Sequence, residues 1–110
     1  MLEKNKLDFG QIYLVTFEGK NIVRGNHFHN HSSEVFCLVS GIVEVILEDV
    51  ETQERFQQVF DASKNEFFRI TLAEKIAHAI RSLSDFAVVV GFSSKEYNPR
   101  KEDKIFYPVI

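Results

Sequence analysis

Cysteine, long hydrophobic runs and charge runs of one sign are scarce or missing in this sequence of 110 residues. Cys37 is the single cysteine, which excludes a disulfide within the chain and favours a reducing compartment. No apolar run reaches the roughly 18 residues that a transmembrane helix requires. The first residues also lack the apolar core of a signal peptide. We therefore expect a soluble, cytoplasmic protein with no membrane partner.

The balance of charges excludes another class of partner. Thirteen Lys and Arg residues face 16 Asp and Glu residues, which gives a formal net charge of −3. No basic run is available to neutralise phosphates, so a nucleic-acid partner is not expected. The chain is long enough for one hydrophobic core and contains no linker, repeat or low-complexity segment. Residues 1–110 are accordingly predicted to form a single domain.

Short segments rich in β-branched and aromatic residues predict an all-β fold with little or no helix. Residues 73–80 contain good helix formers, but the segment is short and uncapped, so its residue types leave its structure open. Eight or nine closely spaced strands favour a closed sandwich or barrel. The expected strands span residues 9–17, 22–29, 34–39, 42–47, 55–60, 66–72 and 86–92.

Several local features refine this prediction. Ser40-Gly41 indicates a hairpin between the strands at 34–39 and 42–47. Gly25 lies inside a strand, where glycine indicates a bulge or a close approach to the backbone. The strand at 86–92 is apolar throughout, which predicts burial on both faces.

Apolar surface is expected to remain uncovered on a single copy of the chain. Val35, Cys37 and Val39 should point outward if Glu34 points inward, and the segment 105–110 is apolar as well. Large exposed apolar patches usually mark interfaces, so a homodimer is predicted.

Chemistry-bearing residues are concentrated just before the strand at 34–39. His27, His29 and His31 alternate, and Glu34 follows them. In an extended strand the first two histidines share a face, and a turn at residues 30–33 would place Glu34 opposite them on a neighbouring strand. Two imidazoles and a carboxylate suit a borderline divalent metal. His31 has the same parity but lies in the expected turn, so it is left out of the site.

This spacing resembles the first motif of the cupin superfamily, H-x-H, three or four residues, E, six residues, G. His27-Phe28-His29, Glu34 and Gly41 match it, whereas His78 alone remains of the second motif. The resemblance implies a cupin-type jelly roll or small β-barrel of about eight to ten strands. It also implies a divalent metal, zinc in the first place and nickel, manganese or iron as alternatives. The implied metal ligands are His27, His29, Glu34 and His78, and the resemblance makes residues 73–80 a turn followed by a short strand that carries His78.

Within the cupins, the run R-G-N-H-F-H resembles the 3,4-ketoisomerases and 3,5-epimerases that act on nucleotide sugars in bacterial polysaccharide biosynthesis. The closing segment is similar to the end of the zinc-binding cupin domain of capsular polysaccharide synthesis reductases. The resemblance implies that Arg24 anchors the nucleotide phosphates and that His27 or His29 is the general base. Tyr97, just after the last long strand, is a further candidate catalytic residue.

The expected function is therefore that of an isomerase. An epimerase or ketoisomerase of this class would transfer a proton α to the keto group of a 4-keto-6-deoxy sugar, which requires a base with a pKa near neutrality. A histidine that ligates a metal cannot also accept this proton, and the sequence leaves both arrangements open. The alternatives are a non-catalytic metal- or sugar-binding cupin and a metal-dependent dioxygenase.

Overall fold

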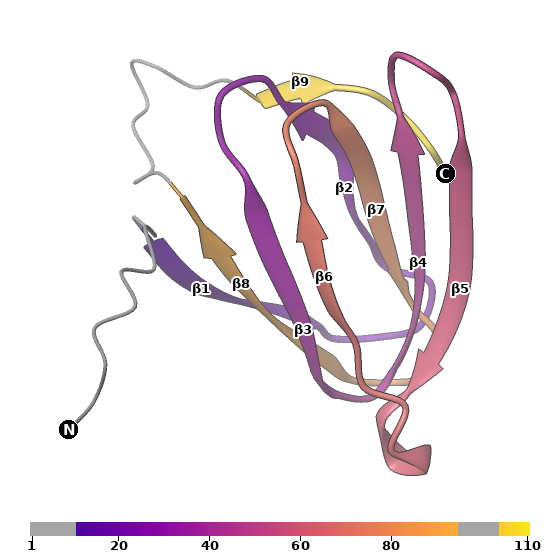
Figure 1. Cartoon of the computed structure of the whole chain (residues 1–110). Coiled ribbons are helices and arrows are strands. Elements are labelled where there is room, and N and C mark those ends of the chain that lie inside the picture. Colours follow the sequence, from indigo (N-terminus) through magenta and orange to yellow (C-terminus); the bar gives the residue numbers. More distant parts are fainter. Residues whose placement is uncertain (1–10, 95–103) are drawn as a thin grey trace, which may run out of the picture.

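The computed structural model describes residues 11–94 and 104–110 (Figure 1). The described residues form nine strands and one short 3-10 helix, η1 (Ala62–Lys64). No helix among them is long and apolar enough to span a membrane. The strands are β1 (Gln11–Phe17), β2 (Val23–His29), β3 (Glu34–Ser40), β4 (Ile42–Asp49), β5 (Arg55–Asp61), β6 (Arg69–Leu72), β7 (Ile76–Ser82), β8 (Ala87–Ser93) and β9 (Lys104–Phe106).

The strands form two antiparallel sheets that face each other (Figure 1). One sheet has the strand order β1-β8-β3-β6 and the other has the order β5-β4-β7-β2-β9. The predicted all-β jelly-roll sandwich is thus confirmed. Its interior is filled by buried apolar side chains of both sheets, namely Phe17, Phe36, Leu38, Val43, Val45, Phe68, Leu72, Ile80, Ala87 and Val89.

Alternation along the strands decides which side chains reach this interior. In β3, Glu34, Phe36 and Leu38 are buried, and the residues between them point outward as predicted. The segment 73–80 resolves in favour of the strand, because its buried face supplies part of the core and the neighbouring strands β2 and β4 take up its backbone hydrogen bonds.

The predicted hairpin at Ser40-Gly41 is wrong, because β3 and β4 lie in different sheets. Gly41 has φ of +91°, and a Cβ there would lie 2.4 Å from the carbonyl oxygen of Phe86. Glycine therefore lets the chain pass close against the start of β8 and cross to the second sheet. A turn signal in a sequence indicates a change of direction, and the strand that is joined next depends on long-range packing.

The prediction that residues 86–92 are buried on both faces is also wrong. Ala87, Val89 and Gly91 are buried, whereas Val88 and Val90 are only partly covered. The strand is central in its sheet, between β1 and β3, but this antiparallel sheet has one face toward the interior and one face outward.

Gly25 marks a bulge in β2, as predicted. The pairing of β2 with β7 shifts register between Gly25 and His27, and Gly25 has φ of +106°. A Cβ at this position would lie 2.6 Å from the carbonyl oxygen of His78. The close approach is therefore to the neighbouring strand β7, and it brings the two histidine-bearing strands tightly together.

The described end of the chain covers part of the outer face of the five-stranded sheet. Val109 is buried there against Ile46, Ala77 and Ala79. The side-chain oxygen of Asn26, in the β2 bulge, accepts a hydrogen bond of 2.9 Å from the amide of Val109. Part of the apolar tail is thus covered by its own sheet, and the homodimer stays a prediction.

Candidate functional site

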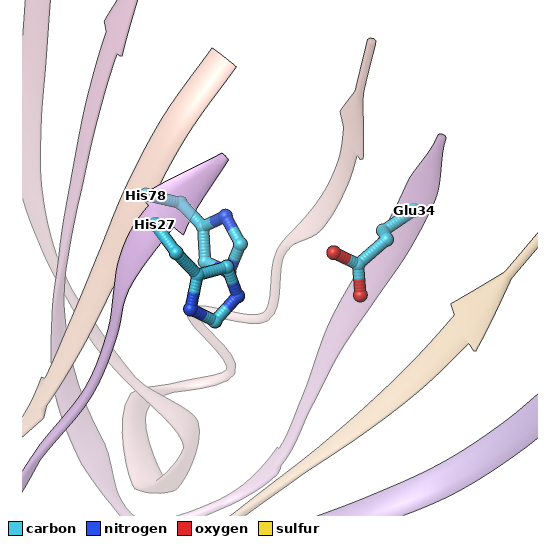
Figure 2. Close-up of side chains that lie close together, drawn as sticks. All are labelled: His27, Glu34 and His78. Atoms are coloured by element: carbon cyan, nitrogen blue, oxygen red, sulfur yellow. The ribbon is translucent and has the colours of Figure 1, made fainter. Parts of the chain in front are cut away.

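The predicted site residues come from three strands in two sheets. His27 and His29 lie on β2, and His78 lies directly opposite His27 on the neighbouring strand β7. The ring centroids of His27 and His78 are 4.6 Å apart. Glu34 lies on β3 of the facing sheet, and Figure 2 shows its carboxylate pointing across the interior toward the two histidines.

The expectation that Glu34 sits on a strand adjacent to the histidines is therefore corrected. Residues 30–33 carry the chain from one sheet to the other, and the parity of β3 then turns Glu34 inward. The carboxylate reaches the histidines across the sandwich. This explains why it is buried, with 5% of its surface exposed.

The hydrogen bond of His27 determines which ring nitrogen carries its proton in the neutral state. Nδ1 lies 3.1 Å from the backbone carbonyl oxygen of Gly25. Because a carbonyl can only accept, Nδ1 is the donor, and the lone pair is on Nε2. A neutral imidazole held in this way can act as a base or as a metal ligand through Nε2.

The geometry also fits a divalent metal. One potential ligand atom from each of His27, Glu34 and His78 lies within 4.8 Å of the others. Nδ1 of His78 and Oε1 of Glu34 are buried without a hydrogen-bond partner among the described residues. Buried polar atoms without partners are uncommon, and a cation bound between them would compensate for their burial.

His29 lies at the edge of this three-residue cluster. Its Nε2 is 2.6 Å from Oε1 of Glu34. The contact is close enough for an ion pair when His29 is protonated. His29 is thus positioned to share a proton with the carboxylate.

The interior environment sets the charge states of the site. Burial is the main cause that lowers the pKa of His78 to about 4, and the nearby His27 lowers it further. Burial and the neighbouring His29 also lower the pKa of His27. Burial opposes ionisation of Glu34, but the contacts with His29 and Tyr13 outweigh it and hold its pKa below the usual value. At neutral pH the site therefore combines the neutral imidazoles of His27 and His78 with an ionised carboxylate.

Tyr13 belongs to this site, although the sequence analysis gave it no role there. Its hydroxyl group donates a hydrogen bond to Oε2 of Glu34. Burial and this ionised carboxylate raise the pKa of Tyr13. The available signal was the alternation of β1, which turns Tyr13 inward together with Phe17, because a buried tyrosine hydroxyl usually has a polar partner.

The other predicted residues have different positions. Arg24 is exposed, and it pairs with Ile80 while His27 pairs with His78. The bulge thus places Arg24 on the same face of β2 as His27, although their separation of three would put them on opposite faces of a regular strand. His31 is exposed and is not part of the cluster. Tyr97 lies outside the described residues.

Two facing antiparallel sheets with an inward His-x-His motif, a glutamate and a later histidine define a cupin. Within this class, the chain belongs to the family of polysaccharide biosynthesis C-terminal domains, which matches residues 2–105. Comparison with curated proteins gives no match.

Three solved structures illustrate the fold. The capsular polysaccharide assembling protein CapF of Staphylococcus aureus is 23% identical, with a TM-score of 0.82 over 93% of this chain and 29% of its own. NovW of Streptomyces spheroides, a 4-keto-6-deoxy sugar epimerase, is 24% identical, with a TM-score of 0.72 over 86% of this chain and 50% of its own. The sugar 3,4-ketoisomerase QdtA of Thermoanaerobacterium thermosaccharolyticum, solved with TDP, is 18% identical, with a TM-score of 0.71 over 88% and 66%.

These likenesses establish the fold. The chain spans less than a third of the CapF chain and half of the NovW chain. The assignment of residues 1–110 to a single domain stays a prediction.

Proposed function

We propose that this chain is an isomerase domain that transfers a proton at the carbon next to the keto group of a nucleotide-linked 4-keto-6-deoxy sugar, in bacterial polysaccharide biosynthesis. Family membership supports the pathway. The observation that carries the proposal is the set of neutral imidazoles beside the ionised Glu34, facing the interior of the sandwich. NovW and QdtA, which share the fold, are sugar isomerases by name.

The chemistry needs a base to remove the proton and positive charge or a hydrogen-bond donor to stabilise the enolate. Neutral His27 can accept the proton at neutral pH, and His29, whose Nε2 lies against Glu34, is the second candidate base. We assign Arg24 to the phosphates of the nucleotide, because a guanidinium group binds phosphate oxygens in a bidentate manner. Its place on the same face of β2 as His27 supports this role.

We further propose that His27, Glu34 and His78, with His29 beside them, hold a divalent metal, zinc in the first place. When bound, the metal would supply Lewis-acid stabilisation of the enolate oxygen. A ligating histidine cannot accept the substrate proton. His29 lies outside the three-residue ligand cluster, so it is the base that would stay available.

Proton exchange tests the isomerase proposal. dTDP-4-keto-6-deoxyglucose incubated with the protein in D2O is expected to gain deuterium next to its keto group. Because a positioned base contributes about 10²–10⁴ in rate, His29→Asn should slow exchange by at least about 100-fold. His27→Asn tests the other candidate base, and His31→Asn, an exposed histidine outside the cluster, is the matched control.

Two outcomes would count against this assignment. No exchange with the unaltered protein would contradict isomerase activity on this substrate. Unchanged exchange in both His27→Asn and His29→Asn would show that the base is a different residue.

Metal content tests the second part of the proposal. Protein purified without a histidine tag is expected to hold about one zinc per chain by elemental analysis, as cupin-like three- or four-ligand sites do. His78→Ala should lose this zinc, because the variant removes a buried ligand, whereas His31→Ala should keep it.

The same measurement separates a second candidate function, a non-catalytic metal-binding cupin. The unpartnered Nδ1 of His78 and Oε1 of Glu34 favour metal binding independently of any reaction. Bound metal without deuterium exchange would select this function. Exchange without bound metal would select a metal-independent isomerase.

A further inference from the structure

Tyr13 reaches Glu34 across the four-stranded sheet. It lies on β1 and pairs with Gly91 of β8, and Gly91 in turn pairs with Phe36 of β3. Cross-strand partners share a face, so these residues line one row on the interior side of the sheet. The ring of Tyr13 meets that of Phe36 edge to face, with 6.3 Å between centroids. From this row the hydroxyl group of Tyr13 donates to Oε2 of Glu34.

The absence of a side chain at Gly91 makes this reach possible. A Cβ at Gly91 would lie 2.5 Å from Cζ of Tyr13 and 2.8 Å from its hydroxyl oxygen. The phenol ring therefore lies directly over the backbone of β8. The reason for glycine here is space, because the φ of Gly91 is outside the left-handed region. The ring of Tyr13 thus packs against the backbone of Gly91.

The two oxygens of Glu34 have different surroundings as a result. Oε2 accepts the hydrogen bond from Tyr13, and Oε1 lies 2.6 Å from Nε2 of His29 without a hydrogen-bond partner among the described residues. With Oε2 held by Tyr13, rotation of the carboxylate is restricted. A hydrogen-bond partner of a metal-ligating side chain orients that side chain and tunes its affinity for the metal.

We propose that Tyr13, whose ring packs against Gly91, is a positioning residue that holds Oε2 of Glu34. It thereby leaves Oε1 alone to contact His29 and a bound metal. The contact between Glu34 and His29 does not depend on the proposed function. The consequence for the metal does depend on the proposed function. Glu34 is a one-oxygen ligand while Tyr13 is in place, and it can offer both oxygens once the hydroxyl group is removed.

The first test reads the position of Glu34 without metal or substrate. In metal-free protein at a single neutral pH, the side-chain ¹⁵N resonances of His29 and the carboxyl ¹³C resonance of Glu34 are measured by NMR. Tyr13→Phe removes the hydroxyl group and keeps the ring, whereas Gly91→Ala keeps the hydroxyl group and displaces the ring. Both variants are expected to shift the two sets of resonances.

A matched control is available on the outer face of the five-stranded sheet. Tyr107 also donates a hydrogen bond to a glutamate, Glu48, but belongs with the cluster on the outer face of the five-stranded sheet. Tyr107→Phe should leave the resonances of His29 and Glu34 unchanged. Unchanged resonances in Tyr13→Phe would overturn the proposal, and this variant decides the question alone if Gly91→Ala does not fold.

The second test uses Co²⁺, whose visible absorption weakens as its coordination number rises. Tyr13→Phe is expected to bind Co²⁺ about tenfold or more weakly, as losses of outer-shell partners usually do. Its absorption should also be weaker, because Glu34 then supplies two oxygens. An unchanged affinity and spectrum in Tyr13→Phe would overturn the role toward the metal. No Co²⁺ binding by the unaltered protein would instead contradict the proposed metal site, and the NMR result would still decide the positioning of Glu34.

Discussion

Gly25→Ala is expected to lower the free energy of unfolding by about 4 kcal/mol, the sum of backbone strain and a steric overlap that each cost roughly 1–3 kcal/mol. The residue has φ of +106°, which side chains rarely adopt, and the new Cβ would lie 2.6 Å from the carbonyl oxygen of His78. That oxygen belongs to the backbone of a central strand, so it cannot rotate away. The strands β2 and β7 would have to separate.

Denaturation by urea measures this effect, with Gly19→Ala as the matched control. Gly19 also has a positive φ, of +145°, but a Cβ there would meet only the side chain of Ile22 at 3.4 Å. The control should lose only about 1 kcal/mol, from backbone strain alone. Equal losses in the two variants would show that the close approach of β2 to β7 contributes nothing. Since typical domains have about 5–15 kcal/mol of stability, the expected difference is readily measured.

The metal-free protein should lose about 3 kcal/mol of stability between pH 7 and pH 4, because one unit of pKa shift corresponds to about 1.4 kcal/mol. Burial lowers the pKa of His78 from 6.5 to about 4. Between these two values the unfolded chain binds a proton that the folded chain does not, so acid favours unfolding. The contribution of neutral His78 to the free energy of unfolding is present above pH 6.5 and is lost progressively as the pH approaches 4. The lowered pKa of His27 acts in the same direction.

Urea denaturation at several pH values, in the presence of a chelator, checks this dependence. His78→Gln should flatten the slope between pH 6.5 and pH 4, because the variant has no imidazole to protonate. His31→Gln, at an exposed position, should retain the slope of the unaltered protein. A slope as steep in His78→Gln as in the unaltered protein would assign the acid sensitivity to another group.

Local patterns predicted those features that depend on neighbours in the chain. Alternation along residues 34–39 placed Val35, Cys37 and Val39 on the face opposite Glu34, and the structure confirms it. The glycine at position 25 indicated the bulge in β2. Both follow from backbone geometry over a few residues, which the residue types specify directly.

Contacts between distant segments could not be predicted in this way. Ser40-Gly41 has the composition of a hairpin turn, yet the chain crosses there to the other sheet, because the packing of Gly41 against Phe86 depends on a strand more than 40 residues away. Tyr13 precedes the histidine motif by 14 positions, and only the pairing of β1 with β8 and of β8 with β3 brings it to Glu34.

The sequence by itself determined the all-β class, the cupin resemblance and the residue types of the candidate site. These depend on composition, alternation and the short spacing from His27 to Gly41, all of which are local. Only the tertiary structure decided that Glu34 faces the histidines from the opposite sheet and that Tyr13 holds its second oxygen. It also decided that burial keeps the imidazoles neutral. The physical reason is that distance across a sandwich, hydrogen bonding and desolvation arise when the two sheets close on each other.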